Sequence, residues 1–134
     1  GMGAYVADRV VKLMLKKGIQ VLDSHILILG FTFKENCPDI RNTKIVDIYH
    51  TLAEYTPNIT VYDPWANSGA VKHEYDIDVV NQLPSDEKYD AVILGVAHNQ
   101  FNDLDIRGLL ANPHEGVIYD VKGILPRDII DDRL

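Results

Sequence analysis

The hydrophobic residues of this chain fall into short unbroken runs, separated by segments whose apolar positions follow helical spacing. Residues 25–30 read HILILG, and residues 90–96 read DAVILGV, the clearest run of this kind. A short apolar run without polar alternation is typical of a strand covered on both faces. Two similar runs, ITVYD at 59–63 and GVIYDV at 116–121, predict two further strands.

Two segments have the periodicity of amphipathic helices. From Tyr5 to Lys17 apolar residues recur every three or four positions, and Gly18 follows where a C-terminal cap belongs. From about Thr43 to Tyr55 the same spacing predicts a second helix, which Pro57 ends. The first helix has an apolar face wider than one sheet could cover, so we predict that this face finds a partner in another molecule.

Strands that alternate with helices indicate an α/β fold with a doubly wound, mainly parallel sheet and helices on both faces, a Rossmann-like three-layer sandwich. We expect a short helix at 106–110, and mostly turns over 64–89 around an apolar piece at 77–80. Ligands of such sheets bind beyond the carboxyl ends of the strands. The segments at that edge are 30–44, 62–65, 97–99 and 121–123.

Composition narrows the class of protein. The chain has 134 residues, of which 46% are hydrophobic and 25% charged, as in an ordinary soluble domain. A single cysteine excludes an internal disulfide and favours a reducing compartment, so we expect the cytoplasm. No run approaches the roughly 20 apolar residues of a membrane helix, and no secretory leader is present. A net charge of −7 argues against nucleic acid as a partner.

The segment GFTFKENCPDIRNTK, residues 30–44, joins the first strand to the second helix. It contains neither GxGxxG nor GxxxxGK[ST], so it is not a glycine-rich cradle for phosphates. Lys34 and Arg41, with a helix N-terminus capped by Asn42 or Thr43, offer a site for an anion. The alternative is a solvated polar loop, which local chemistry alone slightly favours.

Other candidate residues point to structure rather than chemistry. Cys37 has no base near it in sequence and is interpreted as incidental rather than nucleophilic. Asp63 ends the second strand where Rossmann domains hold a ribose-binding acid, but the following Pro-Trp favours a cap or turn. Of the five histidines, His98 is the best placed, and a loop-positioning role is the simpler reading. No two histidines have the sequence spacing of metal ligands. The five are His25, His50, His73, His98 and His114.

The loop at 30–44, followed by VDIYHTLAEY and VYDPWA, resembles the C-terminal domain of the UDP-glucose/GDP-mannose dehydrogenase family. It is nearest to the branch that oxidises UDP-N-acetylhexosamines for bacterial surface polysaccharides. AVILGVAHNQF, VIYDVKGIL and IIDDRL match as well, and MGAYVADRVVKLM resembles the end of the family's long central helix. The resemblance covers nearly the whole chain.

The resemblance implies that the chain is a fragment of an enzyme. Residues 1–18 would end a central dimerisation helix, and residues 19–134 would form the UDP-sugar-binding domain. Full-length members bind NAD on an N-terminal domain and oxidise the sugar's C6 alcohol to a carboxylate in two steps. Their nucleophilic cysteine lies in a Cys-Phe-Pro-Lys-Asp motif that is absent here, so we expect the chain alone to be inactive. Its expected partners are a UDP-sugar, the rest of its polypeptide and a second copy.

The resemblance also implies roles for single residues. Phe33 and Lys34 match the family's substrate-binding Phe-Lys pair, and Arg41 matches an arginine that reaches NAD. Lys122 lies where relatives place a substrate-binding arginine. No catalytic residue and no metal ligand is assigned. The alternative function is a stand-alone doubly wound module that binds a nucleotide or anion without catalysis.

Overall fold

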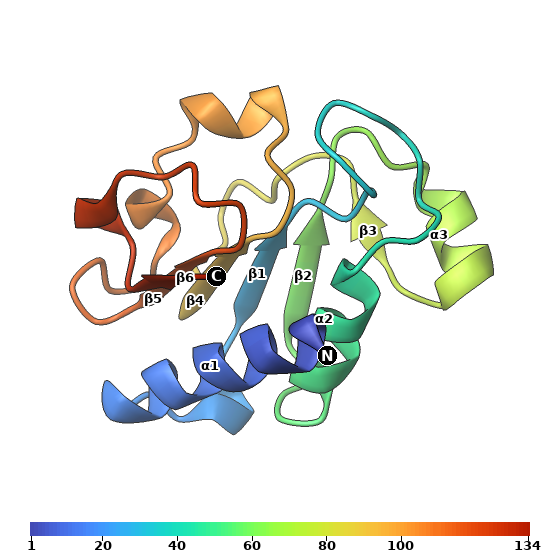
Figure 1. Ribbon diagram of the computed structural model, residues 1–134. Coiled ribbons are helices and arrows are strands. Elements are labelled where there is room, and N and C mark those ends of the chain that lie inside the picture. The colour runs from blue at the N-terminus through green and yellow to red at the C-terminus, as the bar shows by residue number, and fades with distance from the viewer.

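The computed structural model describes residues 1–134 and contains one sheet of six parallel strands (Figure 1). In chain order the strands are β1 (Ile26–Leu29), β2 (Ile59–Tyr62), β3 (Val79–Val80), β4 (Ala91–Leu94), β5 (Val117–Asp120) and β6 (Asp132–Arg133). Across the sheet the order is β3-β2-β1-β4-β5-β6. The chain reverses its winding direction between β1 and β4, which confirms the doubly wound fold and marks the switch point where ligands bind in such sheets.

The continuous apolar runs form the centre of this sheet, as predicted. Every residue of β1, β4 and β5 is buried, and β1 pairs in register with both β2 and β4. Successive side chains of a strand point to opposite faces, so Ile26 and Ile28 enter one core cluster while Leu27 and Leu29 enter another. The two clusters fill the space above and below the sheet.

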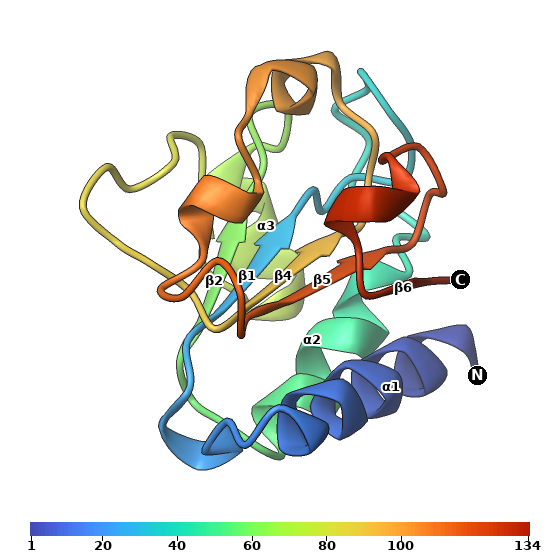
Figure 2. The ribbon, with the colours of Figure 1, turned by 90° about the vertical axis from the view of Figure 1, so that its left-hand side faces the viewer.

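Two helices cover one face of the sheet and pack against each other, α1 (Met2–Lys16) and α2 (Ile45–Ala53) (Figure 2). Gly3 makes the contact close, because a Cβ there would lie 2.5 Å from the Cβ of Asp47 on α2. Val6, Val10 and Met14 of α1 are fully buried by this packing.

Most of the wide apolar face of α1 is covered within the chain, so its width by itself does not require a second molecule. The sequence pattern suggested that one sheet could not cover this face. In the structure the sheet and α2 cover it together. Only Tyr5 and Leu15 remain largely exposed, at 57% and 62%.

Short 3-10 helices and loops cover the opposite face. The helix predicted at 106–110 is a 3-10 helix at Arg107–Leu109, and another spans Asn99–Asp103. Their neighbourhood buries Phe101 and Leu110 against the second core cluster. The sheet therefore has helical cover on both faces, with α-helices on one face and 3-10 turns on the other.

Residues 64–89 contain a helix that the sequence reading did not predict, α3 (Ser68–Tyr75), beside the edge strand β3. Its only buried residue is Val71, so the apolar periodicity is too weak to detect. Local chemistry sets its ends. The Asn67 side chain accepts a hydrogen bond from the N–H of Ala70 at 2.9 Å, and Asp76 ends the helix with φ +55°. The 3-10 turn at Val21–Asp23 and the two-residue strand β6 were also not predicted.

Ion pairs join α1 to the C-terminal end of the chain. Arg9 Nε lies 2.6 Å from an Asp132 carboxylate oxygen, and Lys17 Nζ lies 2.5 Å from Asp131. Lys17 also donates to the carbonyl of Gly116 at 2.7 Å. The structure contains no helix that is both long enough and apolar enough to cross a membrane.

Gly30 allows the exits of β1 and β4 to approach each other at the switch point. Its φ is +95°, in the region that side chains disfavour, and a Cβ there would lie 2.5 Å from the Cβ of Val96. Gly18 offers a matched comparison, because its φ is +77° but a Cβ would meet nothing within 4 Å.

We predict that Gly30→Ala destabilises the fold far more than Gly18→Ala. The left-handed backbone costs about 1–2 kcal/mol at either position, and overlap with Val96 adds about 1–3 kcal/mol at Gly30 alone. Urea unfolding of both variants measures the difference. Equal losses at the two positions would show that the close approach at the switch point does not matter.

Candidate functional site

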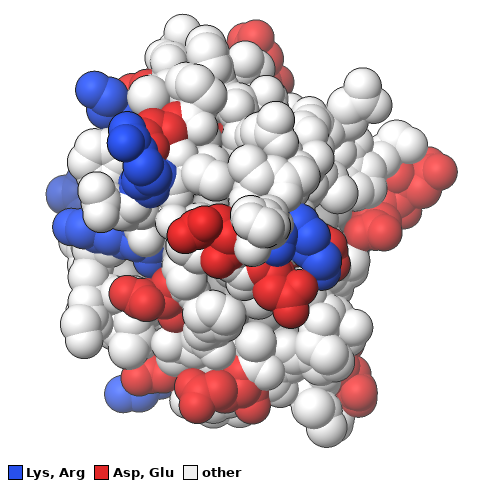
Figure 3. All heavy atoms as spheres, turned by 90° about the vertical axis from the view of Figure 1, so that its right-hand side faces the viewer, with Lys and Arg blue, Asp and Glu red and all other residues white.

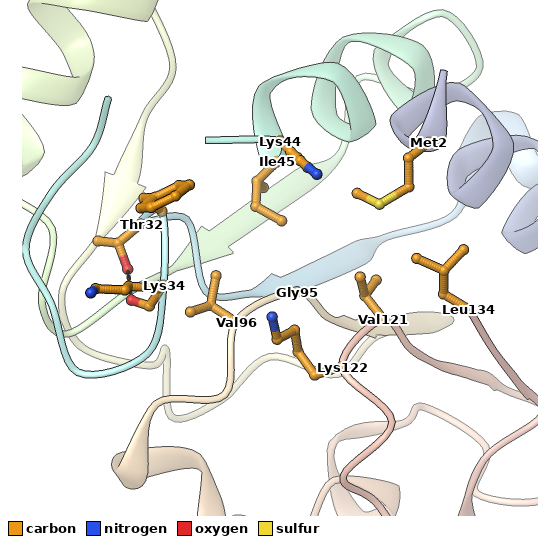
Figure 4. Close-up of a pocket in the computed structure, with 11 residues that line it drawn as sticks. Met2, Thr32, Lys34, Lys44, Ile45, Gly95, Val96, Val121, Lys122 and Leu134 are labelled. Atoms are coloured by element: carbon orange, nitrogen blue, oxygen red, sulfur yellow. Dashed lines mark hydrogen bonds between the residues drawn. The ribbon is translucent and has the colours of Figure 1, made fainter. Parts of the chain in front are cut away.

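A cleft of about 370 Å³ opens at the switch point, beyond the carboxyl ends of β1, β4 and β5 (Figure 4). One part of its lining is apolar and comes from five separate segments of the chain: Met2, Ile45, Val96, Val121 and Leu134. The remaining side chains include Phe33 and three lysines: Lys34, Lys44 and Lys122. The structure thus brings three predicted substrate residues, Phe33, Lys34 and Lys122, to this one lysine cleft.

The cleft is a positive site on an acidic molecule. None of its three lysines forms an ion pair in the structure. In Figure 4 the amino groups of Lys44 and Lys122 are directed into the cleft, whereas that of Lys34 points away from it. On the face that carries α3, most basic side chains lie toward one margin, a further basic group lies on the other side of the face, and acidic side chains are spread over the whole face (Figure 3). Such a concentration of unpaired positive charge favours an anionic ligand.

Lys44 was not predicted from the sequence. It immediately precedes α2, where the free N–H groups of the first turn already carry partial positive charge. A cation is less stable at that end of a helix than an acid, so Lys44 does not contribute to the stability of α2. A lysine at the start of a predicted helix, where it opposes the helix dipole, is the sequence signal that could have pointed to Lys44.

The loop at 30–44 is tied down at both ends. The N–H of Phe33 donates to the carbonyl of Asp39 at 2.8 Å, and the Thr43 hydroxyl donates to the carbonyl of Phe31 at 2.5 Å. The N–H of Ile45 in turn donates to the Thr43 hydroxyl at 3.1 Å. The residue at the N-cap of α2 is Lys44, which makes no side-chain capping bond, so neither Asn42 nor Thr43 is the cap that the sequence suggested. Asn42 instead takes a left-handed conformation with φ +58°. Phe33 projects from this loop and is 51% exposed.

Asp63 is fully buried and is the acceptor on which the rim of the sheet converges. One oxygen accepts from the N–H groups of Phe31 at 2.6 Å and Thr32 at 3.0 Å. The other accepts from the N–H groups of Trp65 at 2.7 Å and Ala66 at 3.0 Å. The prediction that Asp63 caps the chain rather than binding ribose agrees with this geometry.

The same bonds keep Asp63 charged. Burial opposes ionisation and is the largest single influence, but hydrogen bonds from His98, Phe31 and Thr32 outweigh it and lower the pKa of Asp63. The N–H groups of Phe31 and Thr32 lie at the turn after β1, where a Rossmann site binds pyrophosphate. Because they already donate to Asp63, this turn does not fit a dinucleotide.

Lys122 is held by a second buried carboxylate, Asp120, at the end of β5. Asp120 accepts hydrogen bonds from the N–H groups of Lys122 at 3.0 Å, Gly123 at 2.9 Å and Leu125 at 2.7 Å. Gly123 has φ +72°, which makes the turn tight. The backbone of Lys122 is therefore fixed at the mouth of the cleft, while its side chain is free to meet a ligand.

Arg41 lies outside this cleft. Its guanidinium binds both carboxylate oxygens of Asp39 at 3.0 Å and is 84% exposed. These hydrogen bonds lower the pKa of Asp39. Arg41 lines a separate open hollow of about 600 Å³ between the loop and α3, with His73 and Tyr75 among its neighbours. The structure thus places Arg41 apart from the other three predicted residues.

The remaining candidates stay outside the two hollows. Cys37 is a half-buried free thiol that lines neither one. Both ring nitrogens of His98 already have hydrogen-bonding partners in Asn36, Asp63 and Thr32. His98 is therefore not a free base that could activate the Cys37 thiol. The structure contains no cluster of three His, Cys, Asp or Glu side chains able to hold a metal ion.

Residues 27–127 match the UDP-glucose/GDP-mannose dehydrogenase family, UDP binding domain. The chain belongs to this family. It is 47% identical to a UDP-N-acetyl-D-glucosamine 6-dehydrogenase of Salmonella typhi, over 99% of the chain and 31% of that protein. It is 48% identical to the protein of the same description from Pseudomonas aeruginosa, over 100% of the chain and 32% of that protein. The chain therefore spans about a third of the length of these relatives.

Solved structures agree on the fold of the domain. An NDP-N-acetyl-D-galactosaminuronic acid dehydrogenase from Methanosarcina mazei Go1 superposes with a TM-score of 0.80 over 96% of the chain and 26% of its own length, at 18% identity. A UDP-D-ManNAc dehydrogenase from Pyrococcus horikoshii superposes with a TM-score of 0.76 over 98% of the chain and 30% of its own, also at 18% identity. At this identity the likeness supports the domain's fold alone.

We predict that Asp63→Asn destabilises the domain by about 3 kcal/mol. An amide has one acceptor oxygen, so at least two of the buried N–H groups that Asp63 satisfies face an NH2 group instead, at about 1–3 kcal/mol each. Asp103→Asn is the matched control, an exposed aspartate whose change should stay within about 0.5 kcal/mol. Denaturant unfolding of both variants provides the measurement.

The loss caused by Asp63→Asn should also depend on pH. Because the folded-state pKa of Asp63 is lowered from 3.8, its ionisation stabilises the fold above that pH, and the gain disappears as pH falls through the folded value. The gap between wild type and variant should be constant between about pH 5 and 7 and narrow below about pH 4. A gap independent of pH would contradict a role for the charge.

Proposed function

We propose that this chain is the UDP-sugar-binding C-terminal domain of an NAD-dependent UDP-sugar 6-dehydrogenase that acts on a UDP-N-acetylhexosamine. The observation that carries the proposal is the cleft at the switch point, where three unpaired lysines gather on an acidic protein. Family membership and 47% identity to a UDP-N-acetyl-D-glucosamine 6-dehydrogenase support the same reading.

The residues of the cleft divide the task of binding. Lys44 and Lys122, whose amino groups are directed into the cleft, meet the negative charges of the diphosphate, and the N–H groups at the start of α2 add to this attraction. Lys34 lines the same cleft and turns its amino group toward the diphosphate when the ligand binds. Phe33 presents an exposed aromatic ring to the nucleotide, and Val96 and Val121 supply an apolar wall. The role of the domain is to bind and orient the sugar nucleotide. No residue of the chain is assigned to the oxidation itself.

NAD is bound mainly by the part of the enzyme outside this chain. The turn after β1 does not fit a dinucleotide, because Asp63 already occupies its N–H groups. NAD would supply the hydride acceptor for oxidation of the C6 alcohol. Arg41, whose side chain is 84% exposed, is the one residue of this domain that is proposed to contact NAD. We further propose a homodimer in the cytoplasm, with residues 1–18 as the end of the dimerisation helix and residues 19–134 as the binding domain.

We predict that UDP binds the 134-residue chain and that Lys122→Ala weakens this binding about 10- to 150-fold, the loss of one charge-assisted contact. Isothermal titration calorimetry gives the affinity. Lys12→Ala is the control, an exposed lysine of α1 outside the cleft, and should bind UDP like wild type. Inorganic phosphate bound as tightly as UDP would instead favour the stand-alone anion-binding module. NADH production by the chain alone would contradict its role as a binding domain.

In the full-length enzyme, we predict that Lys34→Ala and Arg41→Ala have different kinetic effects. Lys34 lines the lysine cleft and Arg41 lines the other hollow, so they meet different ligands. Lys34→Ala should lower kcat/KM for the UDP-sugar about 10- to 150-fold, whereas Arg41→Ala should mainly raise KM for NAD. Steady-state kinetics with each substrate varied in turn separates the two. An effect of Lys34→Ala on NAD alone would refute the assignment.

A further inference from the structure

His98 is buried without contact to solvent, four residues after the end of β4 and two after Val96, which lines the lysine cleft. Its ring stacks on Trp65 with centroids 6.2 Å apart and meets the edge of Phe101 at 5.4 Å. Both ring nitrogens have polar neighbours. The cleft-binding scheme above leaves this histidine without a role, although it is the fully buried histidine of the rim.

The neighbours of His98 determine which nitrogen carries the proton. The backbone N–H of Asn36 points at Nδ1 from 2.9 Å, and because an N–H only donates, Nδ1 must be the acceptor. The proton of the neutral ring therefore lies on Nε2, which faces a carboxylate oxygen of Asp63 at 2.9 Å. The Thr32 hydroxyl, 3.1 Å from Nε2, donates its own hydrogen to the carbonyl of Lys34 at 3.1 Å. Every hydrogen of this network has an acceptor.

The two nitrogens hold different parts of the rim. Through Nε2 the ring joins β4 to Asp63, which is already fixed by four backbone N–H groups. Through Nδ1 it holds Asn36 at the tip of the 30–44 loop, and the Asn36 side chain accepts from the N–H of Asn99 at 2.9 Å. Asn36 has φ +55°, a left-handed conformation that asparagine adopts more readily than most residues other than glycine.

We propose that His98 is a positioning residue for the sugar-nucleotide cleft. By accepting the Asn36 N–H at Nδ1 it fixes residues 32–36, and with them Phe33 and Lys34, in the conformation that lines the cleft. This inference rests on the proposed function for its effect on UDP, but not for its effect on the loop. The competing explanation is a core histidine that only stabilises the fold.

Two substitutions separate the bonds of His98. In His98→Asn, the side-chain oxygen lies as many bonds from the backbone as Nδ1, so it can accept from Asn36 but cannot reach Asp63. In His98→Gln, the side-chain nitrogen lies as far out as Nε2, so it can donate to Asp63 but leaves Asn36 without its acceptor. His114→Gln, at an exposed histidine, is the control.

The experiment compares amide hydrogen exchange, UDP affinity by calorimetry and thermal unfolding followed by Trp65 fluorescence, all in the 134-residue chain. His98→Gln should speed exchange of the Asn36 amide and weaken UDP binding, each about 10-fold, the effect of one lost hydrogen bond. His98→Asn should keep both within about 3-fold of wild type although it melts earlier, since the bond to the Asp63 charge is the stronger one. UDP affinity that simply follows melting temperature would overturn the proposal.

The experiment also distinguishes failure of the proposed function from failure of the positioning role. If wild type does not bind UDP, the proposed function fails, and Asn36 exchange still decides whether His98 holds the loop. Unchanged protection of Asn36 in His98→Gln would refute the positioning role whether or not UDP binds. Should both variants unfold, long-range 15N–1H spectra of the wild-type ring give the answer, because a proton found on Nδ1 would exclude the bond from Asn36.

Discussion

The rim of this domain depends on one buried carboxylate. Asp63 receives four backbone N–H groups and the Nε2 proton of His98, so the segments after β1, β2 and β4 all converge on its two oxygens. A buried charge is tolerated only when it is fully hydrogen-bonded, and the low pKa of Asp63 shows that these bonds outweigh the effect of burial. The arrangement also uses the N–H groups that a dinucleotide would need. The turn after β1 of this Rossmann-like fold is thereby closed to a dinucleotide.

With the strand ends fixed in this way, the loop at 30–44 divides its charges between two places. Lys34 lies at the cleft of the switch point, and Arg41 lies across the loop beside α3. Asp120 fixes the backbone of Lys122 on the opposite side of the cleft. Its role there is similar to that of Asp63, which fixes the start of the loop. None of the three lysines of this cleft forms an ion pair, and Lys44 at the N-terminus of α2 does not stabilise that helix, so an anionic ligand, as proposed, would account for their arrangement.

The fold was predictable where burial leaves a strong pattern in sequence. The strands β1, β4 and β5 are buried along their whole length and appear as unbroken apolar runs, and α2 keeps its periodicity because it packs on the sheet. α3 was not predicted because it buries only Val71 and depends on its Asn67 cap. The width of the α1 face was read correctly, but its packing on α2 was not predicted. Which element covers a face is a property of packing between distant segments, which periodicity does not report.

By itself the sequence determined the parallel α/β class, the edge of the sheet that carries the site, and, through its resemblance to a known family, the candidates Phe33, Lys34, Arg41 and Lys122. Tertiary structure alone decided that Lys44 joins the lysine cleft, that Arg41 stands apart, and that Asp63 and His98 meet across 35 positions of the chain. The physical reason is that hydrogen bonds and charge clusters depend on distances in space. Strand order brings together segments that are remote in sequence, and local patterns carry no information about which of them will touch.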